Sequence, residues 1–277
     1  MKISCLVPTR GNVVGMTEFA DSIFTTATDP SCVEIVFYID NDDLPSKECA
    51  DKLKERYNIK YLFENRIPLG KTVDECHKLS SGDIFFCGSD DIIMLTKGWD
   101  DIIIDAFDKI EDKIALFYGL ELLHDVSRGG HYFVHRRWLE VLGYITPQYF
   151  GTGDNDQTWC NNQFSVVSDK WVNTISKKIM RRFFVEIYHQ HVNPRHNKGQ
   201  KFVRRKHGGP VREDLDLLMK DEDNNPRTLY RSLKEERRND AMKLTAAIYD
   251  FQSNKQTKFA SVITDEYTEE VQRTYFK

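Results

Sequence analysis

Short apolar runs alternate with helix-like segments through the first hundred residues, at the spacing of βαβ units. The apolar runs predict strands at residues 3–8, 33–39, 59–63 and 84–88. The segments between them predict helices at residues 16–28, 45–57 and 72–79. Strands that are apolar on both faces and are joined by helices indicate a parallel sheet covered on both sides. The pattern therefore predicts an α/β fold.

Two of these strands lead directly into carboxylates. The second strand is followed by Asp40, Asp42 and Asp43, and the fourth by Asp90 and Asp91. In open α/β sheets the ligand crevice lies beyond the carboxyl ends of the strands, so both clusters are expected to line one cleft. Asp and Asn also end strands for purely local reasons. Two clusters at equivalent positions favour a binding site.

The remainder of the chain continues the alternation less regularly. Further strands are predicted at residues 115–123, 131–134 and 185–191. Further helices are predicted at residues 100–109, 138–142, from 157 onward, and from 226 through 238 toward 251. A glycine-rich turn at 149–156 places Asp154 and Asp156 before one of these helices. Either carboxylate could carry chemistry there, or could merely cap the helix.

The strand predicted at 185–191 would end in two imidazoles. With a period of two, Val185, Ile187, His189 and His191 share one face. A single buried histidine is usually a core residue that has found a hydrogen-bond partner. Two at this spacing are a plausible pair of metal ligands.

Charge is distributed unevenly along the chain. The net charge is −4, yet residues 151–277 carry 23 Lys and Arg against 18 Asp and Glu. Residues 170–212 alone hold twelve basic residues and one acidic residue, Glu186. Such a density of one sign usually has an anionic partner. Residues 193–216 are polar and contain glycine, which predicts a loop or lid.

Composition excludes several classes of protein. With 277 residues, 40% of them hydrophobic, the chain is long enough to bury a substantial core and is not expected to be disordered. No apolar run approaches the ~20 residues that span a bilayer, and the start lacks a long apolar secretion signal. We therefore expect a cytoplasmic protein. The six scattered cysteines are interpreted as reduced core thiols.

Taken in order, these segments resemble a known family. A strand ending in Pro8-Thr9, an acidic second strand end, Gly88-Ser89-Asp90-Asp91 and a later Gly-Asp-Asn-Asp at 153–156 are similar to the GT-A nucleotide-sugar glycosyltransferases, especially the family-two type. The resemblance covers about residues 1–191. It implies a GT-A-like catalytic domain at 1–192, with a basic loop and helical extension at 193–277 packed on the same domain.

The resemblance also implies a metal site. A divalent ion would neutralise the charge that develops on the departing diphosphate. The family's Asp-x-Asp segment aligns with Gly88-Ser89-Asp90, so its first Asp is absent here. The metal ligands implied are Asp90, Asp91, His191 and His189. Carboxylate and phosphate oxygens suit Mg²⁺ or Mn²⁺, and an imidazole ligand favours Mn²⁺.

A UDP-sugar donor would lie beside the first two strand ends. By the resemblance, Asp40 would accept from a uracil ring nitrogen, Asp42 would reach the ribose or phosphate, and Lys71 would lie in a loop near the donor. The donor-binding residues implied are Pro8, Thr9, Arg10, Asp40, Asp42, Lys71, Ser89 and Asp90. An inverting transfer also needs a base at the acceptor hydroxyl. Asp156 is our first candidate for that base and Asp154 the second.

The acceptor is inferred from charge, because a diphosphate alone does not account for so basic a segment. Enzymes that glycosylate hydroxymethylated bases in phage DNA would need such a surface, and the target base would be flipped into the cleft. The candidate DNA-binding residues are Arg181, Arg182, Lys198, Lys201, Arg204, Arg205 and Lys206. In that case the protein would work in the host cytoplasm.

Other functions stay open from the sequence. The acceptor could be a glycan, a lipid-linked molecule or a protein. Clustered Asp residues with His-x-His could instead serve a metal-dependent phosphohydrolase. A non-catalytic nucleic-acid-binding module is a further alternative, although it leaves the acidic strand ends without a purpose.

Overall fold

The computed structural model describes residues 1–67, 69–121, 130–145, 163–191 and 230–254. The strands are β1 (Ile3–Thr9), β2 (Val33–Asp40), β3 (Ile59–Glu64), β4 (Ile84–Cys87), β5 (Ile92–Met94), β6 (Leu116–Glu121), β7 (Tyr132–His135) and β8 (Arg182–His191). The helices are α1 (Val13–Thr26), the 3-10 turn η1 (Pro30–Cys32), α2 (Leu44–Lys54), α3 (Leu69–Leu79), α4 (Trp99–Asp108), α5 (Arg136–Leu142), α6 (Gln163–Lys178) and α9 (Lys234–Asn254). Among these described elements, no helix is both long and apolar enough to cross a membrane.

The strands form one sheet in the order β3-β2-β1-β4-β7-β6-β8-β5. Parallel pairing joins β1 to β2 and β4, β2 to β3, and β6 to β8. The exceptions are β7, which is antiparallel to both β4 and β6, and β5, which is antiparallel to β8. The carboxyl ends of β1, β2, β3, β4, β6 and β8 therefore lie at one edge of the sheet, which we call the carboxyl edge.

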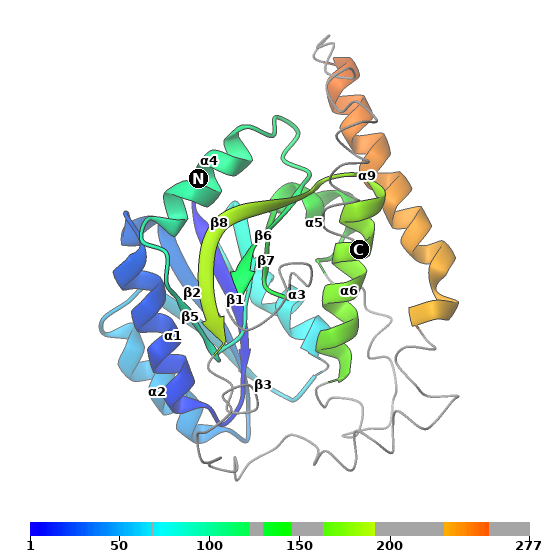
Figure 1. Cartoon of the computed structure of the whole chain (residues 1–277). Helices are drawn as coiled ribbons and strands as arrows, with labels where there is room; N and C mark the ends of the chain where they lie inside the picture. The colour runs from blue at the N-terminus through cyan, green and yellow to red at the C-terminus, as the bar shows by residue number, and fades with distance from the viewer. Residues whose placement is uncertain (68, 122–129, 146–162, 192–229, 255–277) are drawn as a thin grey trace.

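Helices cover both faces of the sheet (Figure 1). One apolar cluster joins the sheet to α1, α2 and α4 through residues such as Phe19, Leu53 and Trp99. The other joins it to α3, α5, α6 and α9, with Trp171 and Leu244 among its buried side chains. Strands buried from both sides explain the uninterrupted apolar runs that predicted a parallel sheet. The predicted α/β architecture is confirmed.

Most predicted elements occur close to their expected bounds, with three differences. Strand β5 was not predicted, because three residues that directly follow Asp91 are too short to show a pattern. Helix α3 begins at Leu69, so Lys71 is an exposed residue of its first turn and the loop predicted for it is wrong. The predicted helices from 157 and from 226 begin outside the described residues.

The alternation predicted for β8 is confirmed where the side chains are described. Val185, Ile187 and His189 are buried, whereas Glu186 and Tyr188 are exposed. Strand β5 pairs antiparallel with this end of β8. The segment that carries Asp90 and Asp91 is thereby joined to the segment that carries His189.

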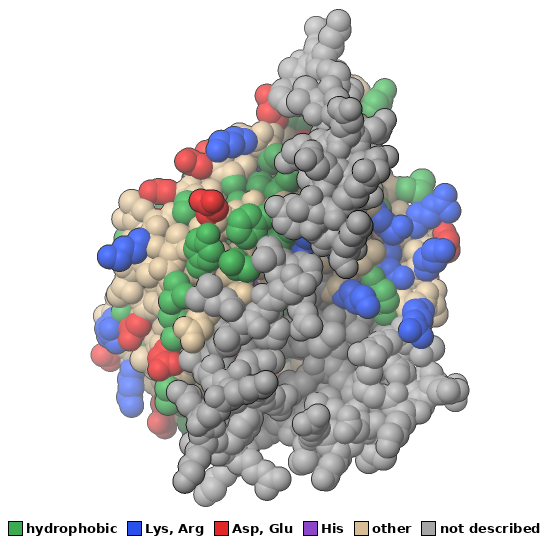
Figure 2. Space-filling model, in the orientation of Figure 1, with side chains coloured by type: hydrophobic (Ala, Val, Ile, Leu, Met, Phe, Trp, Pro, Cys, Tyr) green, Lys and Arg blue, Asp and Glu red, His purple; other side chains and the backbone are tan. Residues whose placement is uncertain are grey.

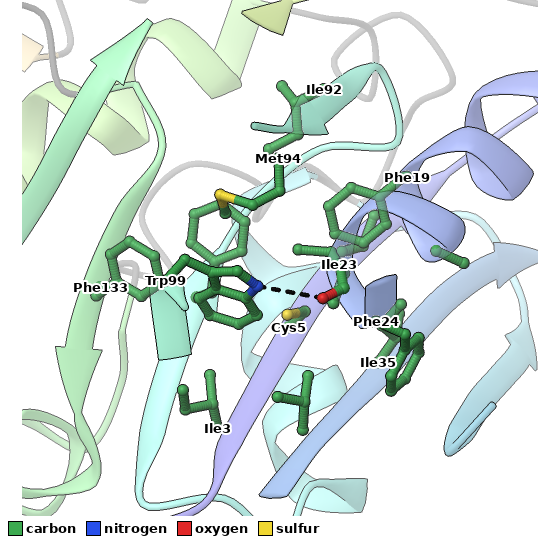
Figure 3. Packing of buried hydrophobic residues seen from close by; sticks show 14 of the residues in the cluster. Ile3, Cys5, Phe19, Ile23, Phe24, Ile35, Ile92, Met94, Trp99 and Phe133 are labelled. Atoms are coloured by element: carbon green, nitrogen blue, oxygen red, sulfur yellow. Dashed lines mark hydrogen bonds between the residues drawn. The ribbon is translucent and has the colours of Figure 1, made fainter. Parts of the chain in front are cut away.

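Trp99 connects α4 to α1 and to the sheet. Its ring is fully buried, and its Nε1 donates a hydrogen bond of 3.1 Å to the carbonyl oxygen of Ile23 (Figure 3). The ring also lies within 6.1 Å of Phe133 and 6.5 Å of Phe86, measured between centroids. The indole thus fills the space between two helices and the central strands.

Replacing Trp99 tests this packing. We expect Trp99→Ala to lower the free energy of unfolding by about 3–5 kcal/mol, because a large cavity replaces the ring. Trp99→Phe also loses the hydrogen bond to Ile23, but it retains most of the apolar volume. It should therefore lower the free energy of unfolding by less than Trp99→Ala does. Urea denaturation measures both.

The control is Tyr249→Ala, because Tyr249 is 69% exposed. It should change stability by no more than about 0.5 kcal/mol. A Trp99→Ala protein as stable as the control would contradict the assigned packing.

Candidate active site at the carboxyl edge

Asp90 is fixed at the carboxyl edge by the last residue of β1 and by the turn that follows it. Thr9 Oγ1 donates to Asp90 Oδ2 at 2.6 Å, and both residues are buried. Asn12 precedes α1 and does not cap that helix with its side chain. Its Nδ2 donates instead to the backbone carbonyl of Asp90 at 3.1 Å. The end of β1 therefore holds the side chain of Asp90, and the turn after it holds the backbone.

Helix α1 approaches Asp90 so closely that a side chain is excluded at Gly15. A Cβ at this position would overlap the carbonyl oxygen of Asp90 and the side-chain amide of Asn12. Gly15 is in the first turn of α1, whose N-terminus lies beside the carboxyl edge. The glycine serves close packing here.

Arg10 pairs with two acids at the end of β2, one in the last position of the strand and one just after it. Its Nη1 lies 2.6 Å from Asp40 Oδ2 and 2.5 Å from Asp42 Oδ1, and its Nη2 donates to Asp42 Oδ2 at 2.7 Å. Arg66 Nε is 3.9 Å from Asp40 Oδ2. Burial raises the pKa of Asp40 despite the pairing with Arg10, whereas the hydrogen bond from Arg10 lowers the pKa of the exposed Asp42. The guanidinium of Arg10 thus offsets part of the negative charge of Asp40 and Asp42.

The side chain of Asp43 is hydrogen-bonded to backbone N–H groups. Its carboxylate accepts from the backbone N–H of Gly11 at 2.6 Å and from that of Ser46 at 3.3 Å, at the start of α2. It therefore caps a helix and fastens the turn after β1 to α2. Of the three acids after β2, only Asp40 and Asp42 contact Arg10.

A chain of four side chains crosses the same edge. The hydroxyl of Ser89 is hydrogen-bonded to Asp91 Oδ1 and lies 3.0 Å from His131 Nε2. His131 Nδ1 is in turn 3.3 Å from His189 Nε2. We call Asp91, Ser89, His131 and His189 the imidazole chain. It connects the turn after β4 to β8 by way of the residue that precedes β7.

Sequence reasoning did not identify His131. Strand β7 runs antiparallel between β4 and β6, so the residue before it lies at the edge where its neighbours end. The sequence predicts a strand at 131–134 but gives no indication of which strands flank it.

The acids and imidazoles of this edge fit a divalent metal ion in kind. Carboxylate oxygen and imidazole nitrogen suit Mn²⁺, and carboxylate oxygen suits Mg²⁺. No three His, Cys, Asp or Glu side chains in the described part of the chain are grouped closely enough to hold a metal by themselves. Oxygens of a bound diphosphate and water would have to complete the coordination shell.

Several predicted site residues are not placed. Strand β8 includes His191, which pairs with Ile92 of β5, but its side chain is not described. The predicted residues outside the described part are Asp154, Asp156, Lys198, Lys201, Arg204, Arg205 and Lys206. Pro8 lies within β1, next to Thr9.

Two predicted DNA contacts are engaged within the protein. Arg181 Nη2 lies 3.0 Å from Asp112 Oδ2. Arg182 lies over the ring of Tyr118, 3.8 Å from its centroid, and burial lowers the pKa of Arg182. The seven-residue span of β8 from Arg182 to His189 corresponds to about 23 Å. Arg182 at the start of β8, and Arg181 just before it, therefore lie at the end of the strand far from the carboxyl edge.

The face shown in Figure 2 carries an apolar patch over β8, and Lys and Arg side chains lie on both sides of it, several of them on the side of α6 and α9. Strand β8 supplies the exposed residues Phe184 and Tyr188.

Comparison with known proteins supports a fold assignment. No protein-family model matches the sequence, and no curated protein matches it. TarS of S. aureus in complex with UDP is similar in structure, with a TM-score of 0.50 and 15% identity over 69% of this chain. The chain spans 60% of that TarS structure.

A second similar structure is the mannosyltransferase PcManGT from Pyrobaculum calidifontis in complex with GDP-Man and Mn²⁺. It has a TM-score of 0.51 and 11% identity, covering 100% of this chain and 88% of the mannosyltransferase. At such low identities the likeness concerns the fold alone. The expected GT-A fold is confirmed.

Gly15→Ala tests the close approach of α1 to Asp90. In an ordinary helix interior this change stabilises by about 0.5–1 kcal/mol. Here we expect destabilisation by about 1–3 kcal/mol, because the added methyl group overlaps the Asp90 carbonyl and must displace it. Chemical denaturation shows whether the substitution raises or lowers the free energy of unfolding.

Val14→Ala serves as the control, because Val14 is the preceding residue of α1 and is 69% exposed. Its effect should be within about 0.5 kcal/mol. A stabilising Gly15→Ala change would show that α1 does not approach Asp90 as described.

Proposed function

We propose that this protein is a metal-dependent glycosyltransferase that moves a sugar from a nucleotide donor, UDP-sugar in the first instance, to a hydroxyl acceptor. The observation that carries the proposal is the meeting of Thr9, Arg10, Asp40 and Asp90 at one edge of a GT-A sheet. The proteins of similar fold include one in complex with UDP and one in complex with GDP-Man and Mn²⁺.

Charge at the carboxyl edge supports a cation in the reaction. Asp40, Asp42, Asp90 and Asp91 together outnumber the nearby Arg10 and Arg66. A diphosphate entering this edge would meet net negative charge, which opposes binding. A divalent ion supplies the missing positive charge and stabilises the leaving diphosphate.

Different residues at the carboxyl edge would bind the two ends of the nucleotide-sugar donor. Asp40 would accept from the base, with Arg10 holding the carboxylate in place at 2.6 Å. Asp90, oriented by Thr9, would face the diphosphate end together with His189 or His191. An inverting mechanism with Asp156 or Asp154 as the base is part of the proposal.

Donor binding tests this function. A panel of nucleotide sugars with and without Mn²⁺ should raise thermal stability only when donor and metal are both present. A ligand at 100 times its Kd stabilises by about 2.7 kcal/mol. We expect a response to UDP-sugars with Mn²⁺, and loss of this response in Asp90→Asn.

The matched control is Asp105→Asn, an exposed carboxylate on α4, which should respond like the wild type. No response of the wild-type protein to any nucleotide sugar would refute the proposed function. A response to GDP-sugars alone would still support a glycosyltransferase, but would show that its donor is a GDP-sugar.

For the acceptor we propose DNA with hydroxymethylated bases, and hence a cytoplasmic site of action. Support comes from the basic excess of residues 151–277. Because Arg181 and Arg182 are engaged with Asp112 and Tyr118, this support now depends on the basic residues between Lys198 and Lys206. A protein or glycan acceptor would not require them.

Hydroxymethylated DNA should stimulate consumption of a UDP-sugar, and unmodified DNA of the same sequence should not. Binding that uses six or more phosphate contacts should weaken by about 1000-fold or more between 50 and 200 mM salt. Replacing Lys198, Lys201, Arg204, Arg205 and Lys206 by Ser should abolish it, whereas donor binding should persist. If neither DNA stimulates turnover, the acceptor is a different class of molecule.

A further inference from the structure

Two aromatic rings are exposed on one face of β8. Phe184 is 37% exposed and Tyr188 is 38% exposed, whereas Val185 and Ile187 between them are buried. Leu95 lies opposite Tyr188, because its backbone N–H donates to the Tyr188 carbonyl at 2.9 Å, and residues opposite each other share a face. Leu95 is 41% exposed. Scattered exposed apolar side chains need no explanation, but a group of them on one face favours a binding surface.

Both aromatic residues are held in place within the fold. The ring of Phe184 packs edge to face against the buried ring of Tyr118, with centroids 5.9 Å apart. The backbone N–H of Tyr188 donates to Thr96 Oγ1 at 2.7 Å, and its carbonyl accepts from Leu95. Residues fixed before a ligand arrives lose little conformational entropy when the ligand packs on them.

Strand β8 bulges between the two aromatic residues. Tyr118 of β6 pairs with Phe184, but the residue two positions later pairs with Tyr188, so β8 has two extra residues here. Gly119 permits the bulge, because a Cβ at that position would lie 2.3 Å from the carbonyl oxygen of Ile187. The bulge brings the two ring-bearing residues closer than the about 13 Å that four extended residues span.

Charge beside the rings is negative at the centre and positive on the side of α6. Glu186, between Phe184 and Tyr188, is exposed. Lys177 is exposed in the last turn of α6, and burial and the nearby charge of Arg182 both lower its pKa. Figure 2 shows further Lys and Arg side chains on this side of the apolar patch. A polyanion on this face would therefore turn its phosphates toward α6 and its uncharged groups toward the rings.

A single strand of nucleic acid has the matching distribution of charge and ring surface. Proteins bind single strands by stacking successive bases on aromatic side chains and by placing cations along the phosphate backbone. Glu186 disfavours a phosphate directly over β8, which leaves that position to the bases. The arrangement therefore favours unpaired bases as the groups that cover Phe184 and Tyr188.

The aromatic face also adjoins the carboxyl edge. Tyr188 directly precedes His189, which contacts His131 at that edge. His191, about 10 Å further along β8, pairs with Ile92 at the start of β5. A strand bound along β8 can thus present one unpaired base to the carboxyl edge while neighbouring bases stack on the rings.

We propose that Phe184 and Tyr188 form a stacking surface for unpaired bases of the acceptor DNA, with Lys177 on the side that contacts its phosphates. The acceptor role of the bound strand rests on the proposed function. Binding of a single strand to this surface is measured without donor, metal or turnover.

Fluorescence anisotropy of labelled deoxycytidine strands with the full chain tests the stacking. Phe184→Ala and Tyr188→Ala should each weaken binding about 5–150-fold, the range for the loss of one stacked base. Phe184→Tyr and Tyr188→Phe each keep a ring and should bind as the wild type does. Tyr249→Ala is the matched control, because it removes an exposed ring on α9, and it should leave binding unchanged.

The salt dependence of the same binding tests the position of the phosphates. Lys177→Ala should weaken binding and reduce the slope of log affinity against log salt concentration by about one, because one phosphate contact is lost. Lys52→Ala is the control, since Lys52 is also an exposed lysine in the last turn of a helix, α2. An unchanged slope in Lys177→Ala would overturn the placement of the phosphates.

A wild-type protein that does not bind single strands, or unchanged binding in both Phe184→Ala and Tyr188→Ala, would overturn the inference. Ring-dependent binding of a neutral oligosaccharide such as maltohexaose, without binding of DNA, would also overturn it and would assign the surface to a glycan. The two alanine variants should retain the thermal response to UDP-sugar and Mn²⁺. Absence of that response in the wild type would refute the proposed function, whereas the anisotropy result still decides the stacking surface.

Discussion

A buried hydrogen bond between Thr9 and Asp90 fixes the geometry of the carboxyl edge. These residues are 81 positions apart and come from the ends of neighbouring parallel strands. Because Asn12 and Gly15 also contact Asp90, the segment after β4 has one position relative to α1. Strand β5 begins two residues later and pairs with β8, so the placement of Asp90 also sets where His189 lies.

The fold could be predicted from the sequence because its main determinant, the apolar character of each strand, is local. Strands covered by helices on both faces must be apolar throughout, and the runs before Asp40 and Asp90 show this without any knowledge of the tertiary structure. Strand β5 was missed because its three residues are held by pairing with β8 and carry no period of their own. The resemblance assigned Lys71 to a loop, which is wrong because α3 starts three residues earlier than the pattern suggested.

The candidate site was only partly predictable, for a different reason. Acids at parallel strand ends must meet at one edge, and Asp40 and Asp90 follow that rule. The importance of His131 arises from the insertion of antiparallel β7 between β4 and β6, which no residue near position 131 encodes. Charge density likewise could not show that Arg181 finds Asp112, or that Arg182 covers Tyr118, since these partners are distant in sequence.

The sheet order also governs when this edge can come into existence during synthesis. Residues 92–94 depend on residues 189–191 for pairing, and a ribosome adding 5–20 residues per second needs roughly 5–20 s to make the intervening chain. Through that interval the nascent protein can pair β1 with β2 and β4, while β5 has no strand beside it. The part of the protein that includes Arg10 and Asp40 is thus synthesised before His189. A ribosome stalled before residue 189 would carry a nascent chain whose carboxyl edge is incomplete.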